Sequence, residues 1–149
     1  MPKLKDVIWV LMQLVLLVIY FFNIDWFDIE VFEHFLWFYV GLLGVIISGI
    51  ALLQLNIHLS PFPPPKPGSK LITNGVFKYI RHPIYSGILI FMFSFSFWLG
   101  DGFKLSISLI TLVFFYYKSS YEESLLEANF ENYKSYKQKA GRFLPKFQT

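Results

Sequence analysis

Four long hydrophobic runs, separated by polar segments, dominate the pattern of this chain. They cover approximately Val7–Phe22, Phe35–Leu55, Ile84–Leu99 and Leu105–Tyr117. The second run has the ~20 residues that a helix needs to cross a bilayer, and the others approach the lower limit of ~17 residues when flanking aromatic residues are counted. Four such runs are difficult to bury in the core of a small soluble domain. The pattern therefore predicts an all-α integral membrane protein with about four transmembrane helices.

A short glycine-rich segment, Gly100–Gly102, separates the third and fourth runs. Such a segment is typical of a tight turn, so we expect these two helices to form an antiparallel hairpin. His82 precedes Asp101 by 19 residues, and Glu122 follows it by 21. If both helices continue, these two residues differ in height by only ~3 Å, because a helix rises by about 1.5 Å per residue. We therefore expect them to meet at one end of the hairpin.

Two further segments belong to the same side of the predicted bundle. Residues 58–78 contain Pro61-Phe-Pro-Pro-Pro-Lys-Pro-Gly68, whose prolines forbid a regular helix and favour extended polyproline geometry. We interpret this segment as a stiff spacer, with a strap across the mouth of the bundle as the alternative. After Glu122, apolar residues recur at roughly helical spacing, which predicts a C-terminal amphipathic helix on the cytoplasmic membrane surface: Leu126, Phe130, Tyr133 and Ala140.

The composition supports a membrane location and excludes several classes of site. Hydrophobic residues make up 55% of the 149 residues and charged residues only 15%, which is little charge for a soluble domain. The absence of cysteine excludes disulfides, thiolate metal sites and thiol nucleophiles, and we expect no metal centre. The net charge of +3 is small, and the basic residues form no patch suited to nucleic acid, so we expect no nucleic-acid partner.

The basic residues are distributed unevenly around the four runs. Of the 13 lysines and arginines, Lys104 is the only one between the third and fourth runs, and none lies between the first and second. The positive-inside rule therefore places both termini in the cytoplasm, which requires an even number of crossings. The first run has no small-residue cleavage pattern after it, so we expect a retained anchor. Acidic residues gather on the side of Lys104: Asp25, Asp28, Glu30, Glu33 and Asp101.

Polar residues cluster where the third run begins and where the fourth run ends. The segment Arg81–Tyr85 contains an arginine, a histidine, a proline and a tyrosine, and Glu122-Glu123 follows the fourth run. Ionisable groups at a membrane boundary are costly and mark candidate functional sites. Each group taken alone has a simpler interpretation: a positive-inside arginine, a solvated histidine, or acidic residues at a helix start. Together with Lys118, they indicate a half-buried pocket for a charged small molecule beside lipid.

These ordered motifs resemble those of the isoprenylcysteine carboxyl methyltransferase-like integral membrane methyltransferases, which are related to the phospholipid N-methyltransferases. The resemblance runs from about Leu55 to Pro145. It implies a single domain, 1–149, with residues 1–56 as a two-helix N-terminal anchor and residues 57–149 as the cofactor-binding half. The matching segments are Ser60–Pro63, Leu71–Phe77, Arg81–Gly87, Glu122–Leu126, Phe130–Tyr136 and Arg142–Pro145.

The resemblance implies that the cofactor is S-adenosyl-L-methionine. The chemistry of this cofactor agrees with Arg81, His82 and Glu122 as the catalytic residues. Arg81 or His82 can pair with the cofactor carboxylate, and Glu122 can accept from its ammonium or nucleoside. Lys118 matches a basic residue assigned to the acceptor substrate. The cofactor contacts correspond to Ser69, Lys70, Leu71, Ile72, Phe77, His82, Pro83, Ile84, Tyr85 and Glu122.

The chain departs from the family pattern at three positions. Phe77 stands where a tyrosine is frequent, so a hydroxyl contact is lost. Lys118 stands where the eukaryotic enzymes have arginine, and the two side chains are not interchangeable at bidentate sites. Glu131 follows Phe130 where the family usually has glycine.

The resemblance implies methyl transfer to a lipid-like or membrane-embedded small acceptor, in what we expect is the bacterial cytoplasmic membrane, and the chemistry of these residues agrees with it. Methylation of a carboxylate needs no base, whereas methylation of an amine needs a proton acceptor, for which His82 or Glu122 is the candidate. One alternative is an NADPH-dependent reductase of the sterol reductase type, although Ile84 departs from the usual His-Pro-Asn-Tyr motif. A second alternative is a non-catalytic membrane scaffold.

Overall fold

The computed structural model is helical throughout the part that it describes, which comprises residues 3–29, 34–55, 68 and 70–147. Within these residues there are five α-helices, one short 3₁₀ helix and no strand. An all-α fold is therefore confirmed. Ser69, Glu30, Glu33 and the proline-rich segment lie outside the described residues.

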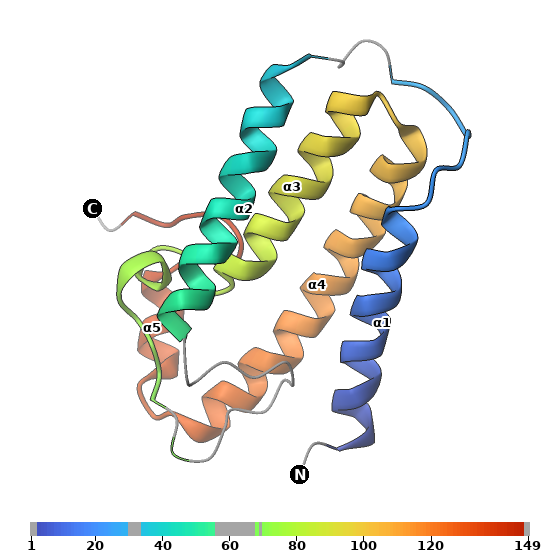
Figure 1. Cartoon of the computed structure of the whole chain (residues 1–149). Coiled ribbons are helices and arrows are strands. Elements are labelled where there is room, and N and C mark those ends of the chain that lie inside the picture. Colours follow the sequence, from blue (N-terminus) through green and yellow to red (C-terminus); the bar gives the residue numbers. More distant parts are fainter. Residues whose placement is uncertain (1–2, 30–33, 56–67, 69, 148–149) are drawn as a thin grey trace.

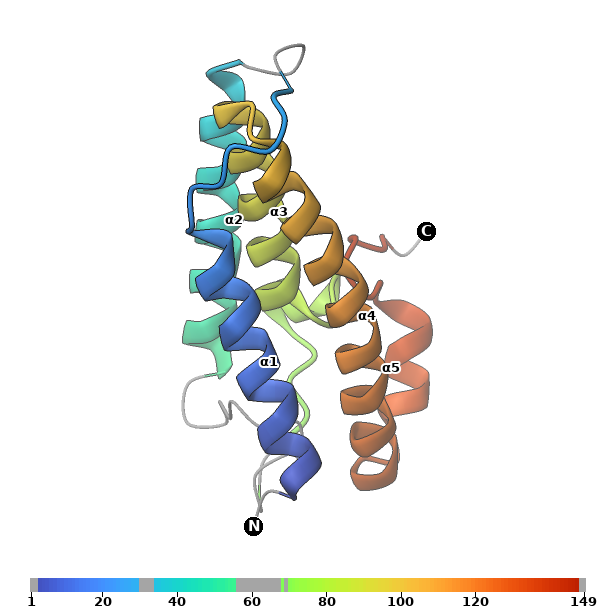
Figure 2. The same cartoon turned by 90° about the vertical axis from the view of Figure 1, so that its right-hand side faces the viewer.

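The four hydrophobic runs correspond to four long helices that lie side by side (Figure 1). These helices are α1 (Leu4–Tyr20), α2 (Leu36–Leu55), α3 (Pro83–Leu99) and α4 (Gly102–Asn129). In both views α3 lies between α2 and α4 (Figures 1 and 2). The short helices η3 (Gly75–Lys78) and α5 (Tyr133–Lys139) lie towards the end of the bundle where α3 begins, and α5 lies beside the distal part of α4 (Figure 2).

The C-terminal helix differs from the prediction. We expected one amphipathic helix to begin near Glu122, but α4 continues past Tyr117 to Asn129 and includes it. Serine, glutamate, leucine and alanine in this extension are compatible with a helix and extend it beyond the hydrophobic run. The helix stops at Phe130, whose backbone is extended, and α5 follows as a separate helix.

Two residues link α3 to α4. Gly100 ends α3 with φ of 65°, a left-handed conformation that glycine adopts without the steric penalty of a Cβ atom. Asp101 caps α4, because its Oδ1 accepts the backbone N–H of Lys104 at 2.9 Å. Backbone groups at the end of α3 and at the start of α4 thus have hydrogen-bond partners. The two helices lie next to each other (Figure 1).

Small residues bring α2 and α3 into close contact. A Cβ atom added to Gly44 would lie 2.5 Å from the carbonyl oxygen of Gly87, and one added to Gly87 would lie 2.3 Å from that of Gly44. Beside them, Ser48 Oγ donates to the carbonyl oxygen of Ile84 at 3.1 Å. Glycine and serine permit such backbone contact between apolar helices. The first turn of α3 is therefore held firmly against α2.

The helix α1 packs on the other side of the bundle, against α3 and α4. Tyr20, which is fully buried, donates its hydroxyl to the carbonyl oxygen of Met92 at 2.7 Å. Lys104 Nζ donates to the carbonyl oxygen of Phe22 at 3.0 Å and to Asn23 Oδ1 at 3.2 Å. These bonds fix the C-terminal end of α1. The first half of α1 lies beside the C-terminal half of α4.

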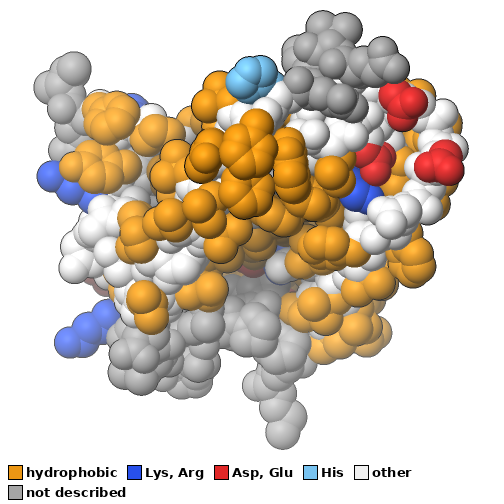
Figure 3. All heavy atoms as spheres, turned by 45° about the horizontal axis from the view of Figure 1, so that its top comes forward, with side chains coloured by type: hydrophobic (Ala, Val, Ile, Leu, Met, Phe, Trp, Pro, Cys, Tyr) orange, Lys and Arg blue, Asp and Glu red, His pale blue; other side chains and the backbone are white. Residues whose placement is uncertain are grey.

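Much of the apolar surface of this bundle is exposed. Hydrophobic side chains cover a large part of the face in Figure 3. Soluble monomers rarely expose so much contiguous apolar surface. Among the described residues, α2 is the helix that is long and apolar enough to cross a membrane by itself. Exposed large hydrophobic side chains on three helices include Leu11, Val15, Val18, Leu42, Ile46, Leu53, Leu109 and Val113.

A buried polar cluster where α3, α4 and α5 meet

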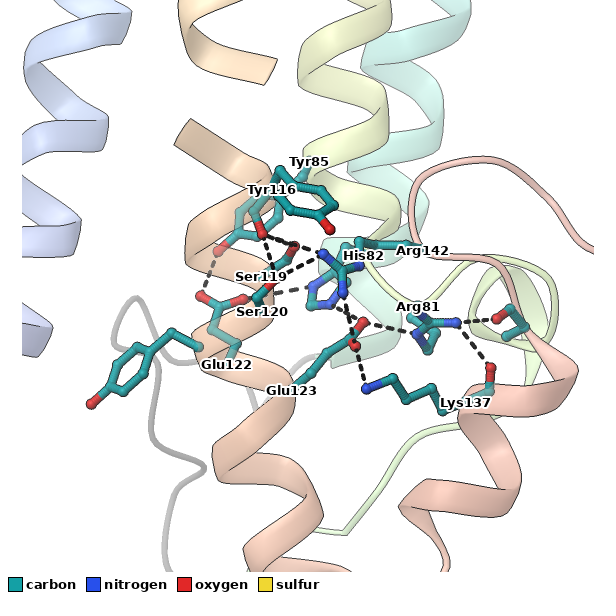
Figure 4. Close-up of polar contacts among 12 residues, drawn as sticks. Arg81, His82, Tyr85, Tyr116, Ser119, Ser120, Glu122, Glu123, Lys137 and Arg142 are labelled. Carbon is teal, nitrogen blue, oxygen red and sulfur yellow. Dashed lines mark hydrogen bonds and ion pairs between the residues drawn. The ribbon is translucent and has the colours of Figure 1, made fainter. Parts of the chain in front are cut away.

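Backbone pairing with a distant segment fixes the residues that lead into α3. The N–H of Arg81 donates to the carbonyl oxygen of Gly141 at 2.8 Å, and that of His82 donates to the carbonyl oxygen of Arg142 at 3.1 Å. Pro83 is the first residue of α3, a position where a proline removes no intrahelical hydrogen bond. The side chains of Arg81 and His82 consequently reach towards α4 (Figure 4).

Glu123 lies at the centre of the cluster (Figure 4). Its Oε1 accepts from Arg81 Nε at 2.9 Å and lies 3.2 Å from His82 Nε2. Its Oε2 lies 3.2 Å from Lys137 Nζ and 3.4 Å from Arg142 Nη2. Burial opposes ionisation of this side chain, which is 1% exposed, but hydrogen bonds from His82 and Arg81 outweigh it and lower the pKa of Glu123 to about 2. One carboxylate thus joins α3, α4, α5 and the C-terminal segment.

Arg81 is engaged by protein groups. Besides Glu123, it donates through Nη1 to the carbonyl oxygen of Lys137 at 3.1 Å and to that of Ala140. These are carbonyls at the end of α5, which a helix leaves without intrahelical partners. Because the side chain is only 9% exposed, its position suits fixing α5 against α3 more than contacting a ligand.

Glu122 points to a different set of partners (Figure 4). Its Oε1 accepts from Tyr85 Oη at 2.6 Å, and its Oε2 lies 3.6 Å from His82 Nδ1. Burial raises the pKa of Glu122, against the opposing effects of His82, Lys118 and the hydrogen bond from Tyr85. A carboxyl group whose pKa is raised holds a proton more readily than a solvated carboxyl group does, so Glu122 is a candidate proton acceptor.

Lys118 brings α1 into the cluster. Its side chain is 2% exposed, and its Nζ donates to Oε1 of Gln13 on α1. The same ammonium lies 3.9 Å from Glu122 Oε1 and 5.3 Å from the centre of the Tyr85 ring. Gln13 therefore connects α1, through Lys118, to the polar groups around Glu122.

Stacked rings set the orientation of the groups around Glu122. The His82 and Tyr85 rings are nearly parallel, with centroids 5.6 Å apart, and Tyr85 stacks on Phe115 at 4.3 Å. Phe143 approaches the edge of His82 at 6.1 Å. Such packing restricts the rotamers of the imidazole and phenol, so the polar atoms are preorganised.

The structure unites some of the predicted site residues and separates others. His82, Tyr85, Glu122 and Lys118 lie together, and His82 and Glu122 are at matching heights, as we expected from the residue count. The segment before the His-Pro motif lies apart from them in the described contacts. Leu71 packs with the cluster of Tyr133 and Tyr136, and the carbonyl oxygen of Phe77 accepts from Tyr136 Oη at 2.6 Å, while Lys70 is exposed and Ile72 half-buried.

Sequence analysis missed the roles of Glu123, Lys137, Arg142 and Gln13. The Glu122-Glu123 pair drew attention to both acids, but nothing in the pattern indicated which would face Arg81. Arg142 belongs to a recognised motif without an assigned contact. The one signal for Gln13 is that an amide interrupts the apolar run of α1, where a polar side chain requires a partner.

The family model described as phospholipid methyltransferase matches residues 32–133, which include α2, η3, α3 and α4. Gln13 on α1 and Arg142 in the C-terminal segment fall outside the matched residues. No curated protein matches the chain. Because the match covers more than half of its length, the chain belongs to the phospholipid methyltransferase family.

Proposed function

We propose that the protein transfers a methyl group from S-adenosyl-L-methionine to a lipid-like acceptor. Family membership supports the reaction class. The observation that carries the proposal is the convergence of Tyr85 and His82 on Glu122, at 2.6 Å and 3.6 Å respectively. These groups come from the first turn of α3 and from α4 just beyond its apolar part, where a soluble cofactor and a lipid can meet.

The donor set fits the polar groups of this cofactor. Glu122 Oε2 lies no closer than 3.6 Å to His82 Nδ1, so it keeps capacity to accept from an ammonium or a ribose hydroxyl. His82 is our candidate partner for the cofactor carboxylate. Arg81 supports His82 through Glu123, and we assign it a positioning role. We retain Ile84, Pro83, Phe77 and residues 69–72 as further candidate cofactor contacts.

The cofactor, when bound, supplies an electrophilic methyl group on a sulfonium. The residues of the chain orient the acceptor and handle its proton. If the acceptor is a carboxylate, no proton is released and positioning beside the buried Lys118 ammonium suffices. If the acceptor is an amine, its proton passes to Glu122 Oε2 or to His82, and Tyr85 holds the other carboxylate oxygen in place. The rings of Phe115 and Phe143 limit access of water.

We propose that α1–α4 all cross the membrane, with α3 and α4 as a hairpin and the apolar part of α4, Leu105–Tyr117, within the bilayer. Exposed apolar side chains along α1, α2 and α4 support this arrangement. In it, residues 1–56 anchor the domain and residues 57–149 hold the cofactor, although Gln13 gives the anchor a part in the site.

Calorimetric titration of the detergent-purified protein tests the proposal. We expect S-adenosylhomocysteine to bind and NADPH to give no heat of binding. Glu122→Gln and His82→Ala should each weaken binding roughly 10- to 100-fold, because hydrogen bonds to charged groups contribute about 1.5–3 kcal/mol. Glu131→Gln, an exposed carboxylate away from the cluster, is the matched control and should bind as the wild type does.

Other outcomes favour other functions. Binding of NADPH would indicate a reductase, and binding of neither nucleotide by a folded protein would indicate a scaffold. Circular dichroism and thermal unfolding of each variant separate loss of binding from loss of fold.

A further inference from the structure

An open pocket lies where η3 meets the C-terminal segment. Its volume is about 330 Å³, and it is lined by Lys78, Tyr79, Lys146 and Phe147. The carbonyl oxygen of Tyr79 accepts the N–H groups of Gly141 at 2.9 Å and Lys146 at 3.1 Å, and the Tyr79 and Phe147 rings lie 5.5 Å apart. The backbone therefore defines this pocket, which has the size of a small-ligand site.

Among the residues that the structure describes, no carboxylate forms an ion pair with the two ammonium groups at this pocket. Lys146 Nζ donates to the carbonyl oxygen of Gln138 at 2.7 Å, and Lys78 Nζ lies 5.6 Å from the centre of the Tyr79 ring. In the described part of the chain, the ion pairs within 4.0 Å involve other lysines: Lys104, Lys118 and Lys137. Two uncompensated ammonium groups at one pocket favour an anion, and lysine is a common ligand of phosphate.

Exposed apolar side chains flank Lys146 in the C-terminal segment, and one of them, Phe147, lines the pocket. Phe147 is 70% exposed and Leu144 is 79% exposed. An aromatic ring beside lysines is typical of a membrane interface, where the lysine stem follows apolar surface and the ammonium reaches the phosphates. A free anion makes no apolar contact with Phe147 and Leu144, whereas a lipid has acyl chains next to its phosphate that can contact both side chains.

We propose that this pocket binds the phosphodiester headgroup of an anionic membrane lipid. The two lysines pair with the phosphate, and Phe147 and Leu144 contact the upper part of the acyl chains. The four lining residues differ from those that surround Glu122, so this lipid is additional to any methyl acceptor. The proposal holds whether or not the protein is a methyltransferase.

Native mass spectrometry of the full chain, released from a neutral detergent, tests the site with dioctanoyl-phosphatidylglycerol as the probe. We expect the double variant Lys78→Ala/Lys146→Ala to lose about tenfold or more in apparent affinity for the lipid. The reason is that the attraction between each lysine and an anionic headgroup contributes substantially to the free energy of binding. The control is Lys134→Ala/Lys139→Ala, which removes the same charge from exposed positions on α5. It should bind the lipid as the wild type does.

Three results would overturn the assignment. Equal losses in the two double variants would show unspecific attraction. Displacement of the lipid by an equal concentration of inorganic phosphate would show a site for the free anion. Equally tight binding of dioctanoyl-phosphatidylcholine would show that the lysines do not select anionic lipids. If the first double variant does not fold, Lys78→Ala alone serves, because in the described part of the chain this side chain makes no hydrogen bond, and a partial loss is then expected.

Discussion

Two adjacent carboxylates, Glu122 and Glu123, point in different directions, and their different directions give them different partners. Glu123 is surrounded by Arg81, His82, Lys137 and Arg142, so its charge is compensated and its function is structural. Glu122 has one close donor and keeps an oxygen available for a ligand. Which of the two faces Arg81 depends on the rotation of α4 about its axis. The residue pattern does not set that rotation, since packing against α1, α3 and α5 does.

Glu123→Gln should destabilise the fold, because it leaves four basic groups without the buried charge that compensates them. We expect a loss of roughly 3 kcal/mol in the free energy of unfolding, as for other broken buried pairs. The loss should also depend on pH. Since the pKa of Glu123 is lowered from 4.5 to about 2 on folding, its ionised form stabilises the protein above about pH 4.5, and this contribution disappears as the pH falls towards 2.

Thermal unfolding in detergent, followed by circular dichroism from neutral to acidic pH, measures both effects. The melting temperature of the wild type should approach that of Glu123→Gln as the solution is acidified. Glu131→Gln, on the exposed surface, should follow the wild type throughout. A constant difference between wild type and Glu123→Gln across the whole range would contradict the role given to this carboxylate.

At the scale of the elements, the hydrophobic runs located α1–α4 well because each helix is apolar along most of its length. The end of α4 and the break before α5 could not be found in this way, because polar helix-forming residues continue without a change in pattern. Counting residues across the α3–α4 link did bring His82 and Glu122 to the same height. It could not bring in Gln13, because its contact with Lys118 depends on how α1 packs.

Gly44→Ala should disturb the contact between α2 and α3, because the added methyl group would lie 2.5 Å from the carbonyl oxygen of Gly87. We expect a loss of about 1–3 kcal/mol, as for other overpacked contacts, and weaker binding of S-adenosylhomocysteine because the first turn of α3 shifts. Gly49→Ala on the same helix meets nothing within 4 Å. It should leave ligand binding unchanged and should not lower the melting temperature, because alanine favours a helix more than glycine does. Equal effects of the two variants would refute this account of the helix contact.

The whole molecule combines an exposed apolar bundle with charged groups gathered at its ends. The distribution of lysine and arginine predicts the orientation, but the described helices include just one that satisfies the length and hydropathy of a membrane span by itself. The others are shorter or carry buried polar groups. Lys104 is bound by residues just after α1, and Lys118 by Gln13 on α1. A span whose polar residues are satisfied only by packing is difficult to recognise from its own composition.

Labelling of introduced cysteines tests the four proposed crossings, and the chain provides a cysteine-free background. We expect Asp25→Cys to react with a membrane-impermeant maleimide in intact cells. Lys139→Cys should react only after the cells are opened, because both termini are proposed to be cytoplasmic. Labelling of both positions in intact cells would contradict the even number of crossings.

The pairing of residues 81–82 with residues 141–142 has a consequence for biosynthesis. A ribosome adds Arg81 and His82 long before Gly141 and Arg142, so the earlier pair enters the membrane region without its partners. The cluster around Glu123 is therefore assembled only when translation is nearly complete. Chains that are released before residue 141 is added can insert their helices but still lack a complete cluster around Glu123.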